Sequence, residues 1–117
     1  MAEPGKERLI TWSDFEAVDI RAGTVLEAHP FPEARKPAYR LTIDFGPLGV
    51  MRSSAQITDL YTPESLKGMQ VVAVVNFPVK QIANHVSECL VLGVYNEDRS
   101  VVLLSPLQTV ENGSKVG

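Results

Sequence analysis

The sequence has little cysteine and no long apolar run. Its single cysteine, Cys89, excludes an internal disulfide and a metal site built from several thiolates, and it fits a reducing compartment. No apolar stretch approaches the roughly 20 residues that a transmembrane helix needs, so membrane insertion is not expected. The first 20 residues carry five acidic side chains and no apolar core of a signal peptide, which favours a cytoplasmic location.

Basic charge is also scarce. The 117 residues hold 11 Lys and Arg against 14 Asp and Glu, and the resulting net charge of −3 argues against an indiscriminate binder of polyanions. The charges are unevenly placed, since residues 34–90 hold six basic and four acidic side chains whereas residues 1–33 hold three and seven. Only the middle of the chain is therefore net positive, and weakly so.

Recognisable catalytic and metal-binding patterns are missing as well. A hydrolase triad could draw on Ser53 or Ser54 with His85, but neither serine lies in a Gly-x-Ser-x-Gly turn. His29 and His85 are far apart, no acidic residue stands at ligand spacing from them, and no glycine-rich phosphate loop occurs. We therefore expect no catalytic residue, no metal and no cofactor. Cys89 is interpreted as a small buried hydrophobe rather than a reactive thiol.

Short runs of alternating or continuous apolar residues predict a small all-β barrel. The predicted strands cover residues 18–28, 39–45, 50–54, 71–75, 90–95 and 101–104. Gly23 predicts a bulge or bend in the first strand. Tyr39 alternates in phase with core positions and is assigned to the core. Residues 1–10, which are polar and contain Pro-Gly, are predicted to be a flexible segment before one domain over residues 11–117.

Two short helices are expected. Ser13, three residues before Glu16, is typical of a capping box, and Trp12 and Phe15 would share one apolar face of the helix that follows. A second helical turn is expected over residues 62–68, which offer an N-cap threonine, a proline at the first helical position and a terminating glycine.

Two polar loops are candidates for function. Residues 76–90 separate two buried strands yet contain proline, amides, hydroxyls and a lysine, and a small barrel usually carries its function on such a loop. Phe31 and Phe77, beside prolines in loops, are predicted to be exposed apolar contacts. Arg35 and Lys36, with Arg40 nearby, form a small basic cluster that fits a solvated loop as well as a ligand contact.

Several motifs together resemble the tRNA-binding domain family, an oligonucleotide-binding (OB) fold that is also appended to aminoacyl-tRNA synthetases. Residues 15–25 resemble the opening of that family, and residues 66–68, 71–76 and 87–88 follow in its order and spacing. Further matches to stand-alone bacterial members described as export-related chaperones cover residues 31–35, 43–46, 53–58, 73–78 and 101–104. The resemblance implies a five-stranded barrel with a short N-terminal helix, a short helix between strands three and four, and a C-terminal extension.

The resemblance also implies where ligands bind. In an OB barrel they lie over strands two and three and against the loops that join strands one to two and four to five. In this chain those segments are residues 39–54, 29–38 and 76–89. The predicted groove residues are Phe31, Arg35, Lys36, Arg52, Ser53, Ser54, Gln56, Asn76, Phe77, Lys80, Gln81, Ser87 and Glu88.

The function implied by the resemblance is a non-enzymatic chaperone. It would bind unfolded or export-bound polypeptides as a homodimer, with Trp12 and Phe15 and the C-terminal segment at the dimer contact. The export ATPase SecA and tRNA are further candidate partners. RNA-binding members carry Ser-Glu-Gly-Met where residues 87–90 read Ser-Glu-Cys-Leu, and this difference favours polypeptide binding. A structure-specific tRNA-binding module is the alternative.

Overall fold

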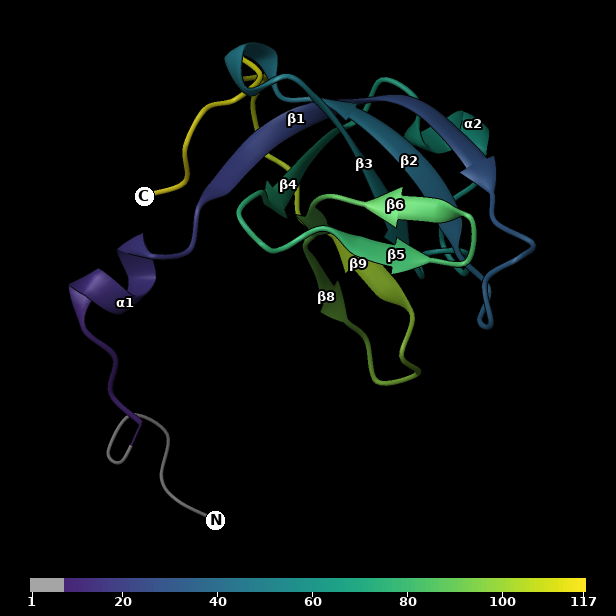
Figure 1. Cartoon of the computed structure of the whole chain (residues 1–117), viewed down its shortest axis with the longest axis horizontal. Helices are drawn as coiled ribbons and strands as arrows, with labels where there is room; N and C mark the ends of the chain where they lie inside the picture. The colour runs from purple at the N-terminus through teal and green to yellow at the C-terminus, as the bar shows by residue number, and fades with distance from the viewer. Residues whose placement is uncertain (1–7) are drawn as a thin grey trace.

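The longest strand, β1 (Ile20–Pro30), organises the sheet in the computed structural model, which describes residues 8–117 (Figure 1). It pairs with β2 (Tyr39–Asp44) along its second half and with β4 (Gln70–Val74) along its first half. β3 (Val50–Ala55) and β7 (Leu90–Val91) complete an antiparallel sheet of five strands in the order β3-β2-β1-β4-β7. The two outer strands of this sheet are β3 and β7.

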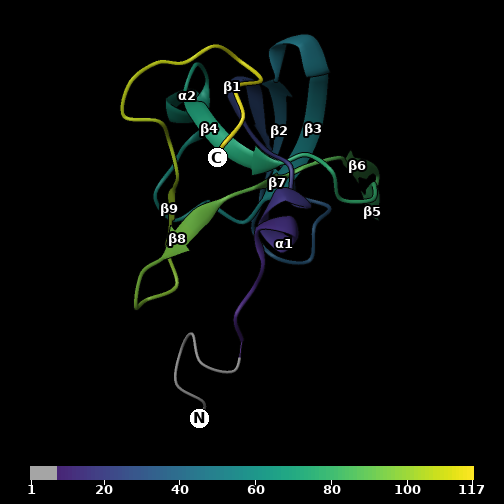
Figure 2. The same cartoon turned by 90° about the vertical axis from the view of Figure 1, so that its left-hand side faces the viewer.

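Contacts beside β7 bring the two ends of the sheet together (Figure 2). The Ser53 hydroxyl donates to the carbonyl of Cys89 over 2.8 Å, and the N–H of Glu88 donates to the carbonyl of Arg52 over 2.8 Å. The sheet therefore curls into a nearly closed five-stranded barrel. The predicted all-β OB fold, with one short helix before it and one between strands three and four, is confirmed.

The remaining elements are short. They are α1 (Trp12–Glu16), the 3-10 helix η1 (Gly46–Leu48), α2 (Pro63–Leu66), β5 (Lys80–Ile82), β6 (His85–Ser87), β8 (Gly93–Tyr95) and β9 (Val101–Leu103). β5 pairs with β6, and β8 pairs with β9, in two separate hairpins. The first hairpin lies inside the predicted polar loop, and the strand predicted over residues 90–95 is divided into β7 and β8.

The core forms inside the barrel, where alternate residues of β2 point inward. Leu41, Ile43 and the following Phe45 are fully buried, as the alternation predicted. Tyr39 packs against the same core, and its hydroxyl donates to the carbonyl of Tyr61 over 2.7 Å. The assignment of Tyr39 to the core is confirmed.

Gly23 does not mark the bulge in β1. The register of β1 against β2 shifts between Val25 and Glu27 instead. A Cβ atom on Gly23 would lie 2.7 Å from Cδ1 of Phe45 and 2.8 Å from Cγ2 of Ile43, so close packing against these side chains requires the glycine. The prediction of a bulge at Gly23 is wrong, because β1 keeps its register with β4 through this residue and the glycine serves the packing of the core.

The cap of α1 differs from the predicted one. Thr11, not Ser13, is the N-cap: its side chain accepts from the N–H of Asp14 over 3.2 Å, and the Asp14 carboxylate accepts from the N–H of Thr11 over 2.8 Å. Because the helix begins at Trp12, its third residue is Asp14, and Glu16 is its last. The predicted cap of α2 by Thr62, with proline at the first helical position, is confirmed.

The C-terminal segment runs beside the first half of β1. The N–H of Gly113 donates to Ala22 over 2.7 Å, and the N–H of Val116 donates to Ile20 over 2.9 Å. Most of the segment predicted to be flexible, residues 1–10, lies outside the described residues. Within residues 8–117, no helix is long and apolar enough to cross a membrane.

Candidate binding groove

A reciprocal contact fixes the hairpin β5–β6 to the edge of the barrel. Oε1 of Glu88, just after β6, accepts from the backbone N–H of Arg52 over 2.9 Å and from its Nε–H over 3.3 Å. The N–H of Glu88 donates back to the Arg52 carbonyl. Both residues were predicted to line the groove. Arg52 on β3 and Glu88 therefore bind each other, and the carboxylate of Glu88 balances the charge of the Arg52 guanidinium.

Phe31 joins the β1–β2 loop to the same hairpin. Its side chain is 3% exposed, so the prediction that it is an exposed apolar contact is wrong. The loop folds back because the N–H of Phe31 donates to Ala38 over 3.1 Å. The ring then meets the edge of the His85 ring at a centroid distance of 5.4 Å, and the Arg40 guanidinium carbon lies 5.7 Å from its centroid. The sequence around Phe31 could not predict this burial, because the residues that pack against its ring, Arg40 and His85, lie on β2 and β6.

The hairpin and β7 enclose a hollow of about 280 Å³. Its lining residues are Phe77, Pro78, Lys80, Ser87, Glu88, Cys89 and Leu90. Phe77 is 53% exposed and Leu90 is 48% exposed, so two apolar side chains face the solvent in a hollow that Lys80, Ser87 and Glu88 also line. The structure thus brings together four of the predicted groove residues and adds Leu90, which the sequence assigned only to a strand.

Three predicted groove residues bind their own chain instead. Ser53 is fully buried on the inner face of β3, where its hydroxyl donates to the carbonyl of Cys89 and helps to close the barrel. The Asn76 amide donates to the carbonyl of Ala17 over 2.8 Å and accepts from the N–H of Asp19 over 3.0 Å, which ties the end of β4 to the segment between α1 and β1. The Gln81 amide donates to the carbonyl of Ala83 in the hairpin turn over 2.8 Å.

The other predicted groove residues remain on the surface. Arg35 and Lys36 are exposed in the β1–β2 loop, Gln56 is exposed after β3, and Ser54 is half-buried on the outer face of β3. None of these four side chains lines the hollow beside the hairpin. The signal that separates them from Ser53 is the strand period, because Ser53 and Ser54 point to opposite faces of β3.

The Cys89 thiol at the base of the hollow is unreactive by its surroundings. Burial raises the pKa of the Cys89 thiol from 9.0 to about 11, and the nearby carboxylate of Glu88 adds to the rise. Since the thiolate is the nucleophile, the raised pKa and the burial of the thiol both disfavour covalent chemistry at Cys89. The interpretation of Cys89 as a buried hydrophobe is confirmed. No group of three or more His, Cys, Asp and Glu side chains within the described chain could hold a metal ion.

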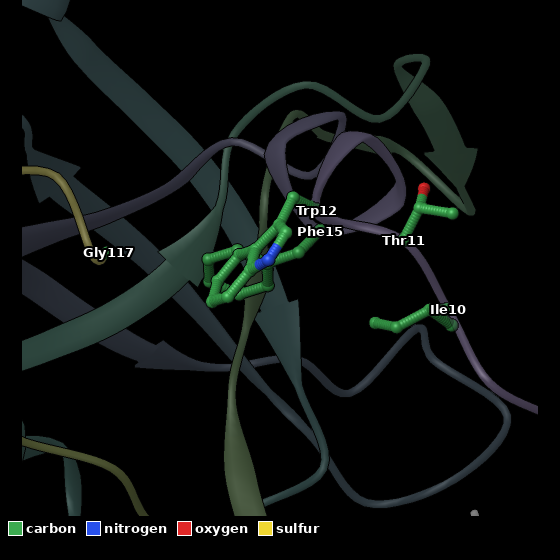
Figure 3. A pocket seen from close by; sticks show the side chains of 5 residues that line it. All are labelled: Ile10, Thr11, Trp12, Phe15 and Gly117. Carbon is green, nitrogen blue, oxygen red and sulfur yellow. The ribbon is translucent and has the colours of Figure 1, made fainter.

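A second, larger hollow lies between α1 and the chain end. It measures about 840 Å³ and is lined by Ile10, Thr11, Trp12, Phe15 and Gly117. Figure 3 shows Trp12 and Phe15 projecting from the same side of α1, as their spacing predicted. Trp12 is 82% exposed, so a large apolar surface is open here.

The chain that carries these two hollows can be compared with known proteins in sequence and in fold. Residues 20–115 match the model of the family described as "Putative tRNA binding domain". The chain belongs to this tRNA-binding domain family. The predicted resemblance is thereby confirmed, and the family's barrel is the one that carries the groove described above.

Solved structures of stand-alone family members cover nearly the whole chain. A structure of chaperone CsaA from Bacillus anthracis str. Ames is 53% identical with a TM-score of 0.89, and covers 94% of this chain and 100% of that one. A CsaA chaperone protein from Picrophilus torridus is 49% identical with a TM-score of 0.87, and covers 93% and 100%. The chain is therefore CsaA-like in fold and extent.

Longer relatives share only the domain. The methionine–tRNA ligase of Porphyromonas gingivalis is 37% identical over 107 residues, which are 92% of this chain but 15% of the ligase. The chain spans about 15% of the length of this relative, so the match concerns the family domain and not the rest of the ligase.

Proposed function

We propose that the chain is a non-enzymatic cytoplasmic chaperone that binds extended segments of unfolded, export-bound polypeptides. The observation that carries the proposal is the hollow beside the β5–β6 hairpin, where Phe77 and Leu90 remain exposed beside Lys80 and Glu88. Full-length likeness to two CsaA chaperone structures supports it. A contact with the export ATPase SecA belongs to the same proposal, since export-bound clients would have to be passed on.

The size of the hollow favours loose, sequence-tolerant recognition. About 280 Å³ lies near the lower limit of small-molecule pockets, so it suits one or two apolar side chains of a longer chain. Lys80, which lines the hollow, supplies an ammonium for backbone carbonyls of a client, whereas the Ser87 hydroxyl donates to the carbonyl of Cys89 over 3.4 Å. Such a site contacts only a short part of a client. Each contact would be weak and tolerant of sequence.

We further propose that two copies pair through the α1 hollow. A dimer would cover Trp12, Phe15 and Ile10 and would present two grooves to one long client, which raises avidity without tightening either site. Replacing both aromatic residues, W12E with F15E, should give monomers by analytical ultracentrifugation. L60E removes a half-exposed apolar side chain elsewhere and should leave the dimer unchanged. A double variant that remains dimeric would refute this interface.

The groove itself is tested by titrating the protein with a labelled, unstructured preprotein segment across a salt series. We expect saturable binding with a weak salt dependence and about tenfold weaker binding by F77A. The matched control is L60A, because Leu60 is 52% exposed and Phe77 is 53% exposed. Equal binding by F77A and L60A would place the client elsewhere on the protein.

The family match supports a second candidate function, tRNA binding. Three exposed cations could contact phosphates: Arg35 and Lys36 in the β1–β2 loop, and Lys80 at the start of β5. A tRNA complex would weaken steeply with salt, because each neutralised phosphate releases counterions. Tight, steeply salt-dependent tRNA binding with no peptide signal would make tRNA the ligand.

A further inference from the structure

One cation on the outer face of the barrel lacks an acceptor. β2 turns Leu41 and Ile43 inward, and the strand period therefore turns Arg40 and Thr42 outward. In the described part of the chain, Nε of Arg40 is the one buried side-chain nitrogen or oxygen without a hydrogen-bond partner. The ion pairs among residues 8–117 use Arg21, His29 and Arg52, and none uses Arg40.

The position of this guanidinium is fixed. Its central carbon lies 5.7 Å from the centroid of the Phe31 ring, within the range of a cation–π contact. Phe31 is itself buried against His85, whose Nε2 lies 3.1 Å from the carbonyl of Ser53. Arg40 therefore stands on a rigid support that includes the β1–β2 loop, β3 and the hairpin.

The strand register supplies a second donor beside Arg40. Its partner on β3 is Ser54, and its partner on β1 is His29. Within the described chain the Ser54 hydroxyl has no hydrogen-bond partner, whereas His29 lies 3.7 Å from the carboxylate of Glu27. β2 lies between β1 and β3 in the sheet, and Figure 2 shows the hairpin β5–β6 on the β3 side. The free donors thus lie on the same side of the barrel as the hairpin.

Partial burial without a partner makes Arg40 a stronger anion binder than the loop lysines. The folded chain has already removed water from its Nε, so an incoming anion does not bear that cost again. Its Nη groups stay accessible, because neither is buried, and they present the planar fork that matches a carboxylate. Lys36 and Lys80, by contrast, are exposed, so an anion that binds them has to displace water from the ammonium group.

We propose that Arg40 and the hydroxyl of Ser54 form a binding site for an aspartate or glutamate side chain of the bound polypeptide. The inference rests on the proposed function and adds a preference to it: clients would carry an acidic residue near an apolar one. The apolar side chain would occupy the hollow with Phe77, and the carboxylate would reach Arg40 along the hairpin.

The test compares two labelled, unstructured peptides with blocked termini that differ only by Glu against Gln at one central position. Wild-type protein should bind the Glu peptide about tenfold more tightly, the size expected of one charge-assisted hydrogen-bonded pair. R40Q should bind both peptides equally. K67Q removes one exposed positive charge near α2 and should keep the wild-type preference.

R40K keeps the positive charge but removes the planar guanidinium. It is also the variant to measure if R40Q does not fold. It should retain only part of the Glu preference, since an ammonium lacks the planar geometry. Equal binding of both peptides by wild-type protein, or an unchanged preference in R40Q or R40K, would overturn the proposal. If R40Q weakens tRNA binding more than K67Q does, Arg40 contacts phosphate and the proposal is also overturned. Failure of both peptides to bind any variant would refute the proposed function itself.

Discussion

Truncating Phe31 should affect stability and truncating Phe77 should affect binding, because the first ring is buried and the second is half-exposed. F31A removes a side chain that is 3% exposed and packed between Arg40 and His85. F77A removes a ring that is 53% exposed at the rim of the hollow. The first change should lower the free energy of unfolding, and the second should lower affinity for polypeptide.

The expected magnitudes follow from burial. Replacing a buried Phe by Ala costs about 3–5 kcal/mol, and the lower end applies to Phe31 because the loop around it can relax. With a urea m-value of about 1–3 kcal/mol/M, the midpoint of F31A should fall by about 1–3 M. F77A should stay within about 0.5 kcal/mol of wild type in stability, since it leaves no cavity.

Urea unfolding followed by far-UV circular dichroism measures both variants. Fluorescence of Trp12 is unsuitable as the reporter, because that side chain is exposed on α1 outside the core. Binding of the preprotein segment is then measured at low urea, where F31A is folded. A midpoint for F31A equal to that of wild type would refute the role of Phe31 as a support. Equal destabilisation by F77A would refute the assigned exposures.

Two further predictions concern the barrel itself. The Cys89 pKa rises from 9.0 to about 11 on folding, so the unfolded thiol loses its proton first and stability should fall as pH rises from about 9 to about 11. Urea unfolding over this pH range should show a loss of about 2 kcal/mol in wild type that is absent from C89A, and parallel curves would contradict the burial of the thiol. G23A should lower stability by about 1–3 kcal/mol in thermal or urea unfolding, because Phe45 and Ile43 are fully buried and cannot move away from the new Cβ. Wild-type stability in G23A would show that the core is looser than described.

The fold could be predicted from the sequence because alternation and caps are local signals. The period of β2 gives the inward direction of Tyr39 and Leu41 directly, and Thr62 with its following proline marks the start of α2. Gly23 shows the limit of such signals. A glycine in a strand serves either a bulge or a close neighbour, and the neighbour here, Phe45, is brought in by the barrel and not by the local sequence.

The groove was harder to predict because its contacts join segments far apart in the chain. Phe31 lies in a loop without period, and its burial depends on His85. The hairpin β5–β6 has strands of three residues, too short for a clear alternation. The polarity of residues 76–90 pointed to the segment that lines the hollow, but it could not separate side chains that are free for a ligand from those that bind the chain itself.

Under the proposed function, that separation would let one small barrel hold varied clients. Arg52 and Glu88 bind each other, and Asn76 binds the segment after α1, so the polar residues nearest the hollow fix its walls. The free groups are different in kind: Phe77 offers apolar area, and Arg40 offers an oriented cation. Rigid walls lower the entropic cost of binding, while few direct contacts keep the sequence requirement low. A groove built in this way should select clients by the spacing of an apolar and an acidic residue rather than by a defined motif.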